Sequence, residues 1–375
     1  MNRKKIVFLS GTRADFGKLK SLIEILRHNE MFEVHIFVTG MHMDKKYGYT
    51  VHEIEKCGYD NIYKFINSDD GAFMDITLSK TIKGFADYIR LIEPDLIIVH
   101  GDRLEALAGA TVGAFNNILV AHIEGGELSG TVDELIRHAV SKLSHTHFVA
   151  NEEAKKRLRQ MGEVSENIFV IGSPDMDAMM SDNLPSLNEV LSYYEIPFDN
   201  YAIAMFHPVT TEVGNMDLYA ESYTAALEES GCNYIVIYPN NDNGSGFILN
   251  KIKKLEQNPR FKLFPSVRFE AFLCMLENAL FIVGNSSAGI REAPFYAVPT
   301  VNVGTRQNGR TVNEHIIHTG YGKDEIVEAI NRAKESKVPK VSLFGNGSSN
   351  QKFSEIIANE TFWQTPKQKV FSDKF

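Results

Sequence analysis

LFIVGNSSAGIREA, at residues 280–293, joins a short apolar run to a turn of small polar residues. The run predicts a buried strand, and the residues after it predict the first turn of a helix. The N–H groups of a helix start and the hydroxyls of Ser286 and Ser287 suit a phosphate, and Gly284 and Gly289 would let the backbone approach a ligand. An ordinary Asn/Ser helix cap is the alternative.

A turn of the same kind lies near the other end of the chain. Residues 6–10 predict a strand, and GTRADFG at residues 11–17 leads into a second predicted helix. Two such turns, one in each half, predict a nucleotide held in a cleft between two domains.

Short apolar runs alternate with helical patterns along the chain, which is typical of parallel α/β folds. The first set of predicted strands lies at residues 5–10, 33–39, 96–100, 118–122, 146–150 and 168–171. The second set lies at residues 201–206, 234–238, 261–264, 280–283 and 300–303. We therefore predict two doubly wound, Rossmann-like domains facing a cleft. They comprise residues 1–180, to which a C-terminal helix at 350–375 returns, and residues 181–349.

Composition narrows the class of partner. The chain has 375 residues and a net charge of -9 with no Lys/Arg block, which argues against nucleic acid or an anionic membrane as the main partner. No apolar run reaches the length of a membrane span or of a signal-peptide core. Cys57, Cys232 and Cys274 form no CxxC pair, so we expect no metal site and a reducing, cytoplasmic compartment.

Titratable side chains follow the predicted strands. Asp102 comes after the strand at 96–100, Glu124 comes after the strand at 118–122, and His207 ends a strand of the second domain. Asp133 and Arg137 stand at i and i+4 on the next predicted helix. Because ligands bind at the carboxyl edge of open α/β sheets, we expect these groups to converge on one site.

Structural roles are the alternatives for these groups, although Glu124, between Ile123 and Gly125, has no obvious capping role. Asp102 could cap the following helix, and His207 could be a turn histidine before Pro208. Asp133 and Arg137 could form a surface ion pair of little energetic consequence.

These motifs, with others in the same order, resemble hydrolysing UDP-N-acetylglucosamine 2-epimerases of bacterial sialic acid and capsule synthesis. The matching stretches are GTRAD (11–15), VTGMH (38–42), HGDR (100–103), HIEGGE (122–127), DELIRH (133–138), HPVTT (207–211), GNSS (284–287) and GTRQ (304–307). The resemblance covers nearly the whole chain. It implies a glycosyltransferase-B (GT-B) architecture in which the second domain holds UDP and the sugar faces the first domain.

The resemblance also implies roles for individual residues. The matched catalytic residues are Asp102, Glu124, Asp133 and His207. The residues matched to UDP and sugar binding are Arg13, Arg103, Arg137, Asn240, Val267, Phe272, Ser286, Ser287, Glu292 and Arg306. Among these, Glu292 would face the ribose, and Val267 and Phe272 would lie against the uracil.

The reaction that the resemblance implies converts UDP-N-acetylglucosamine to UDP and N-acetylmannosamine through a glycal. It calls for no cofactor and no metal, and it implies a homodimer or homotetramer. The alternatives are the same reaction on a UDP-2,4-diacetamido-trideoxy sugar, a non-hydrolysing 2-epimerase, a GT-B glycosyltransferase, and a silent nucleotide-sugar binding module. The sequence leaves open the substituent at sugar carbon 4, the assignment of acid and base, feedback regulation and the final glycan.

Overall fold

A computed structural model describes residues 3–67, 73–310 and 316–370. The acidic pair Asp69 and Asp70, for which the sequence favours a solvated loop, lies outside the described residues. The chain divides into two compact units. The first unit comprises residues 1–127, 133–181 and 344–375, and the second comprises residues 128–132 and 182–343.

The first unit is built on a parallel sheet. Within the described residues this sheet has seven strands in the order β3-β2-β1-β4-β5-β6-β7. They are β1 (Lys4–Ser10), β2 (Phe32–Val38), β3 (Ile62–Lys64), β4 (Leu96–His100), β5 (Leu119–Ile123), β6 (Thr146–Val149) and β7 (Ile168–Val170). The helices are α1 (Arg13–Arg27), α2 (Val51–Lys56), α3 (Met74–Ile92), α4 (Leu104–Phe115), α5 (Val132–Leu143), α6 (Glu152–Gln160), α7 (Pro174–Met179) and α14 (Ser349–Ala358).

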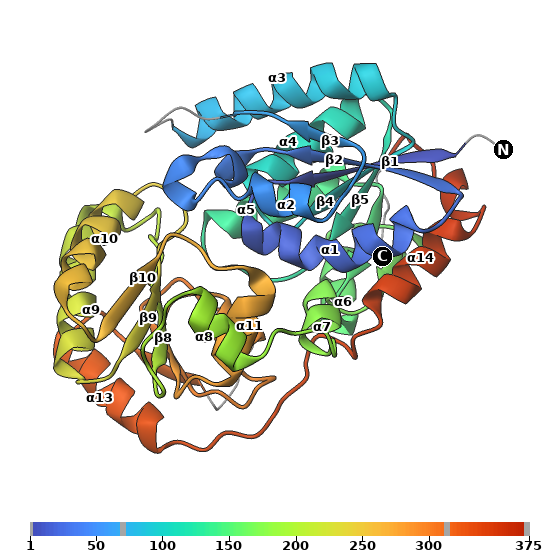
Figure 1. Ribbon diagram of the computed structural model, residues 1–375. Helices are drawn as coiled ribbons and strands as arrows, with labels where there is room; N and C mark the ends of the chain where they lie inside the picture. The colour runs from blue at the N-terminus through green and yellow to red at the C-terminus, as the bar shows by residue number, and fades with distance from the viewer. Residues whose placement is uncertain (1–2, 68–72, 311–315, 371–375) are drawn as a thin grey trace. The chain divides into compact units, whose positions relative to one another are not determined.

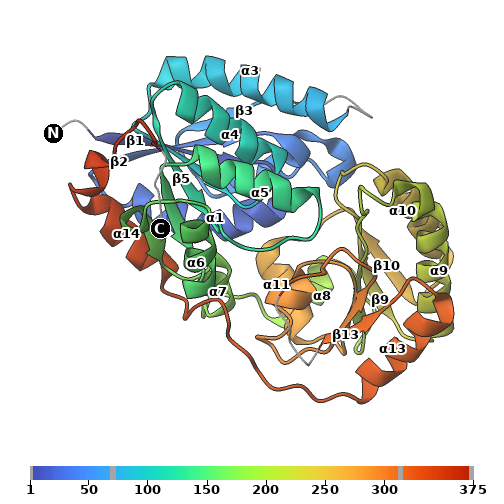
Figure 2. The ribbon, with the colours of Figure 1, turned by 180° about the vertical axis from the view of Figure 1, so that it is seen from behind.

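Helices cover both faces of this sheet, which explains why its central strands are apolar almost throughout. Ile6 and Phe8 of β1 lie in one hydrophobic cluster with buried residues of α1 and α14, on one face of the sheet. On the opposite face, Gly109 of α4 lies against Val99 and Leu9, and its missing side chain allows the helix to come that close. Figures 1 and 2 show α3 and α4 side by side on that second face.

The second unit repeats the same plan. Within the described residues its parallel sheet has six strands in the order β10-β9-β8-β11-β12-β13. They are β8 (Ala202–Met205), β9 (Tyr234–Ile237), β10 (Phe261–Phe264), β11 (Ile282–Gly284), β12 (Thr300–Val303) and β13 (Ile316–Thr319). The helices are α8 (Leu187–Tyr193), α9 (Met216–Glu229), α10 (Ser245–Ile252), α11 (Phe269–Glu277), α12 (Ala288–Arg291) and α13 (Lys323–Glu335). The prediction of two doubly wound, Rossmann-like sheets is confirmed.

Three details differ from the sequence-based expectation. The edge strands β3 and β13 were not predicted, because each is short and carries exposed or polar positions. The helix expected over 350–375 is shorter: α14 ends at Ala358, and a 3₁₀ turn at Phe362–Gln364 follows.

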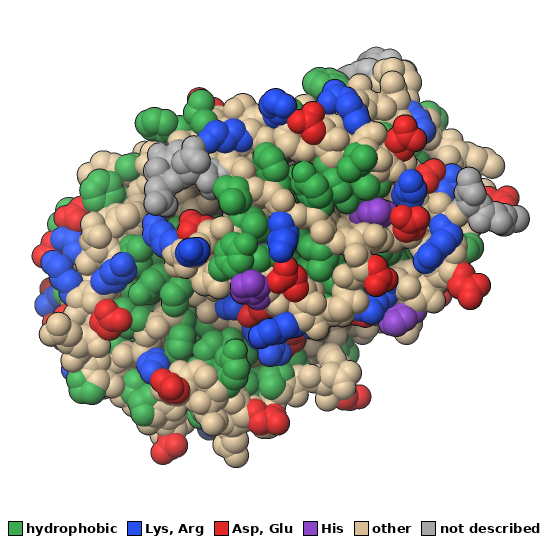
Figure 3. All heavy atoms as spheres, turned by 45° about the horizontal axis from the view of Figure 1, so that its top comes forward, with side chains coloured by type: hydrophobic (Ala, Val, Ile, Leu, Met, Phe, Trp, Pro, Cys, Tyr) green, Lys and Arg blue, Asp and Glu red, His purple; other side chains and the backbone are tan. Residues whose placement is uncertain are grey.

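The helices and the surface add two observations. In the described ranges, no helix combines the length and the apolar character that a membrane-spanning helix requires. On the face drawn in Figure 3, acidic and basic side chains are interspersed.

Candidate functional site

The predicted motifs lie at the point in each sheet where the strand order reverses. In the first unit, strand order runs outward on both sides from β1 and β4, and in the second unit from β8 and β11. Open α/β sheets bind ligands at the carboxyl ends of such strand pairs, because the helices that follow leave the sheet in opposite directions. Both GTRAD and HGDR follow the first pair, and both HPVTT and GNSS follow the second.

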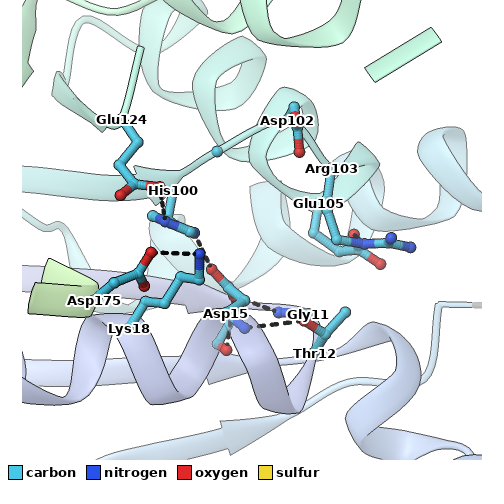
Figure 4. Close-up of polar contacts among 12 residues, drawn as sticks. Gly11, Thr12, Asp15, Lys18, His100, Asp102, Arg103, Glu105, Glu124 and Asp175 are labelled. Atoms are coloured by element: carbon cyan, nitrogen blue, oxygen red, sulfur yellow. Dashed lines mark hydrogen bonds and ion pairs between the residues drawn. The ribbon is translucent and has the colours of Figure 1, made fainter. Parts of the chain in front are cut away.

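Charged side chains form a row of hydrogen bonds across the carboxyl edge of the first sheet (Figure 4). His100, the last residue of β4, places Nδ1 2.8 Å from Asp15 Oδ1 and Nε2 3.1 Å from Glu124 Oε2. Asp15 also accepts from the hydroxyl of Ser10 at 2.9 Å and from the backbone N–H of Gly11 at 3.1 Å. The imidazole therefore joins carboxylates from α1 and from the end of β5.

The charge of His100 follows from these neighbours. Burial alone would lower its pKa, but the hydrogen bonds with the Asp15 and Glu124 carboxylates outweigh burial and raise the pKa of His100 to about 9. His100 is thus an imidazolium at neutral pH that donates from both ring nitrogens. Close by, burial lowers the pKa of His42 to about 4, so that ring is neutral beside Ser10.

Glu124 is held tightly where β5 ends. It is 3% exposed and has a φ of 63°, a left-handed conformation that non-glycine residues rarely adopt. The hydroxyl of Ser173 donates to Oε1 while His100 donates to Oε2. Two donors and an uncommon backbone conformation fix this carboxylate, as is common at functional sites.

Asp102 is paired with Arg137. The guanidinium of Arg137 donates to Asp102 Oδ2 and, at 2.6 Å, to the backbone carbonyl of Glu124. The surface-pair alternative is wrong, because Arg137 is only 4% exposed and reaches two other site residues. The helix-cap alternative for Asp102 is also wrong, since the N-cap of α4 is Arg103.

The remaining predicted residues of the first unit surround this edge. Asp133 is half-buried in the first turn of α5. Arg13 begins α1, and its guanidinium pairs with Glu53 of α2. Arg103 Nε lies 3.6 Å from Glu105 Oε2. Within the first unit the structure thus brings Arg137 into contact with both Asp102 and Glu124.

In the second unit, Asn285 connects the predicted residues. Its side-chain Oδ1 accepts from the backbone N–H of His207 at 2.6 Å, and its Nδ2 donates to the His207 carbonyl at 2.8 Å. Its own carbonyl accepts from Arg306 Nη1 at 3.3 Å and from Gln307 Nε2 at 2.7 Å. The backbone N–H of Asn240 donates to His207 Nδ1 at 3.0 Å.

The structure adds two findings on the phosphate turn. The helix after it, α12, has only four residues because Pro294 follows closely, so half-buried Ser286 and Ser287 stand before a single turn. The glycines have packing reasons: a Cβ at Gly284 would lie 1.9 Å from the Met205 carbonyl oxygen, and one at Gly289 would lie 2.6 Å from Thr300 Cγ2. Close strand and helix packing thus explains these two glycines, and their role in the approach of a ligand stays a prediction.

Three other predicted binding residues are largely buried. Glu292 is 3% exposed and caps the end of α12. Val267 and Phe272 are 8% and 6% exposed, just before and within α11. Their roles at the ribose and the uracil stay predictions.

Sequence reasoning did not assign a site role to Asp15, His100, Ser173 or Asn285. Each lies in or next to a quoted motif or strand end, and that position is the available signal. Their contacts span 85, 24, 49 and 78 positions of the chain, so only the folded structure brings the partners together.

Two doubly wound sheets, each with polar motifs at its carboxyl edge, define a two-domain α/β class of the kind that binds nucleotides. The chain belongs to the UDP-N-acetylglucosamine 2-epimerase family, whose model matches residues 24–358.

Three relatives are similar to this chain over nearly its whole length. The chain is 52% identical over 374 residues to the UDP-N-acetylglucosamine 2-epimerase of Neisseria meningitidis serogroup B, with 99% of each chain covered. It is 34% identical to the UDP-N,N'-diacetylbacillosamine 2-epimerase (hydrolyzing) of Legionella pneumophila, covering 94% of this chain and 95% of the relative. It is 33% identical to the polysialic acid biosynthesis protein P7 of Escherichia coli, covering 94% and 91%.

Solved structures share the fold. The Methanocaldococcus jannaschii UDP-GlcNAc 2-epimerase in complex with UDP-GlcNAc and UDP superposes with a TM-score of 0.80 at 23% identity, covering 94% of this chain and 99% of that one. The Glycyrrhiza uralensis glycosyltransferase UGT73P12 matches with a TM-score of 0.55 at 11% identity, covering 97% and 94%. The predicted GT-B fold class is confirmed by these neighbours.

Proposed function

We propose that the protein is a hydrolysing UDP-N-acetylglucosamine 2-epimerase that releases UDP and free N-acetylmannosamine. The observation that carries the proposal is the carboxyl edge of the first sheet. There Asp102 and Glu124 follow adjacent strands, Arg137 contacts both residues, and His100 holds Glu124. The names of the Neisseria and Legionella relatives support the reaction class.

The chemistry requires a base, an acid and stabilisation of a leaving phosphate. A carboxylate removes the proton at sugar carbon 2, the bond between carbon 1 and the UDP oxygen breaks, and its electron pair leaves with UDP. Water then adds at carbon 1 of the resulting glycal, and a proton returns to carbon 2 from the opposite face. Asp102, Glu124 and Asp133 are the proposed proton-transfer groups, without an assignment of which is the acid.

The second unit is proposed to hold UDP. Ser286 and Ser287 lie at the carboxyl end of β11, where their hydroxyls and backbone N–H groups suit phosphate oxygens. Arg306 is anchored beside them on the Asn285 carbonyl and would supply positive charge to the diphosphate. His207, after β8, would face the same ligand.

The test is incubation of the purified protein with UDP-N-acetylglucosamine, followed by separation of nucleotides and sugars. The proposal predicts UDP and free N-acetylmannosamine in equal amounts. UDP-N-acetylmannosamine as the stable product would contradict the hydrolysing assignment. The Legionella relative makes UDP-N,N'-diacetylbacillosamine the second substrate to try, and preference for it would change the substituent at sugar carbon 4.

Assembly stays a prediction. The expected homodimer or homotetramer is tested by sedimentation of the purified chain, and a monomer at micromolar concentration would contradict it.

A further inference from the structure

We propose that Asn285 is a positioning residue for His207: it holds the His207 backbone so that Nδ1 accepts from the Asn240 N–H, which makes the ring the Nε2–H tautomer and a hydrogen-bond donor. The identity of the acceptor, an oxygen of the nucleotide sugar, rests on the proposed function. The tautomer and the role of Asn285 rest on contacts within the second unit alone.

The tautomer follows from one contact. The backbone N–H of Asn240 lies 3.0 Å from His207 Nδ1. A backbone amide nitrogen can only donate, so Nδ1 must accept and carries no proton. The single ring proton of a neutral His207 is therefore on Nε2, which makes that nitrogen a donor.

Asn285 fixes the backbone from which this ring extends. Its amide pairs with both the N–H and the C=O of His207, at 2.6 and 2.8 Å. Because one backbone group only donates and the other only accepts, the orientation of the amide is determined as well. Pro208 follows His207 and restricts its backbone to extended conformations.

Asn285 is itself held on every polar atom. It is fully buried, and its N–H donates to the Met205 carbonyl at 3.0 Å. Its carbonyl accepts from Arg306 and Gln307. One residue of β11's carboxyl turn thus joins the ends of β8 and β11 to the loop after β12, which is the arrangement that a preformed ligand site needs.

The consequence concerns the role of His207 in proton transfer. To take up a proton at Nδ1, the ring would have to lose its hydrogen bond from Asn240, and Nε2 already carries a proton. The geometry therefore favours a donor to a ligand oxygen over a base that takes the proton from sugar carbon 2. The place of the donor, after β8 and beside the turn with Ser286 and Ser287, suits an oxygen of the phosphate or of the attached sugar.

The tautomer is measured by nitrogen-15 NMR of the full chain with ring-labelled histidine, at neutral pH and without substrate. The His207 signal is identified by its loss in the His207→Gln variant. The proposal predicts a single Nε2–H pattern in the unmodified protein. An Nδ1–H pattern or a cationic ring would overturn it.

The role of Asn285 is measured in the same spectra. In Asn285→Ala, the His207 signal should move toward an average of both tautomers, as in a solvent-exposed histidine. In Asn233→Ala, which removes a solvent-exposed hydrogen bond from a half-buried side chain of the same unit to the Asn200 carbonyl, it should not move. An unchanged His207 pattern in Asn285→Ala would refute the positioning role. If that variant does not fold, the pattern of the unmodified protein still decides the tautomer.

Two substitutions at His207 separate donor from acceptor. Gln can place an N–H near the position of Nε2, whereas Asn can only replace the acceptor near Nδ1. With UDP-N-acetylglucosamine, His207→Gln should keep a kcat/KM about tenfold above that of His207→Asn, the size of one retained hydrogen bond. Equal values or the reverse order would overturn the donor role. If neither the unmodified protein nor any variant turns over UDP-N-acetylglucosamine, the proposed function fails. The NMR result still decides the proposal on Asn285.

Discussion

The positive charge of His100 predicts how the stability of the first unit depends on pH. His100→Gln removes an imidazolium that is buried between the carboxylates of Asp15 and Glu124. The pKa of His100 rises from 6.5 to about 9 on folding. One pKa unit corresponds to about 1.4 kcal/mol, so this proton stabilises the folded first unit by about 3 kcal/mol.

The sign follows from where the proton is bound. Below pH 6.5 both folded and unfolded chains hold it, and the stabilisation is fully present. Between pH 6.5 and about 9 only the folded chain holds it, so the free energy of unfolding falls as pH rises. Above that range the contribution is lost. His42, His122 and His147, whose pKa values are lowered by burial, act in the opposite sense and below pH 6.5.

The chain provides a probe for this measurement. Trp363 is the single tryptophan of the sequence, and it packs against Phe32 in the first unit. Urea unfolding followed by its fluorescence at several pH values therefore reports on the unit that contains His100. The stability difference between the unmodified protein and His100→Gln should shrink by about 3 kcal/mol from pH 6 to pH 9.5.

A matched control is His52→Gln in the same unit. The His52 side chain is 64% exposed and pairs with Glu55 at the surface, so its removal should give no such trend. A difference between the unmodified protein and His100→Gln that stays constant over this pH range would refute the charged state of His100.

Three further predictions concern the carboxylates, the phosphate turn and the C-terminal segment. Asp102→Asn should lower turnover of UDP-N-acetylglucosamine on the order of a hundredfold, while calorimetry finds UDP affinity within about twofold of normal; near-normal turnover removes Asp102 from proton transfer. Ser287→Ala should weaken UDP binding about three- to tenfold through one lost hydrogen bond, and unchanged affinity places the phosphate elsewhere. Lys369→Ala should lower the stability of the first unit by about 2 kcal/mol, because Lys369 Nζ lies 2.5 Å from the buried Glu163 carboxylate. Lys367→Ala, at an exposed position two residues away, is the matched control, and equal losses in both variants would contradict the ion-pair explanation.

The central strands were predictable because parallel sheets covered on both faces give nearly continuous apolar runs. Strands such as β4 and β5 are buried along almost their whole length, and this pattern is visible in the sequence. The edge strands β3 and β13 were missed because exposed or polar positions interrupt their short apolar pattern, whereas the edge strands β7 and β10 were predicted. The shortness of α12 could be inferred only by giving Pro294 more weight than the small residues before it.

The candidate site was predictable as a set of strand ends, and its internal contacts were not. The sequence places His100 at the end of a strand, but its partners Asp15 and Glu124 depend on the order of β1, β4 and β5 in the sheet. The sequence places Asp133 and Arg137 at helical spacing, but it does not show that Arg137 is buried and pairs with Asp102, 35 positions away.

The central claim is that the protein removes the proton at sugar carbon 2 and releases UDP by hydrolysis. A proton NMR time course of the purified protein with UDP-N-acetylglucosamine in deuterated water tests both steps at once. The account predicts UDP together with free N-acetylmannosamine that carries deuterium at carbon 2. Product that retains the original hydrogen at carbon 2, or a sugar that stays bound to UDP, would contradict it.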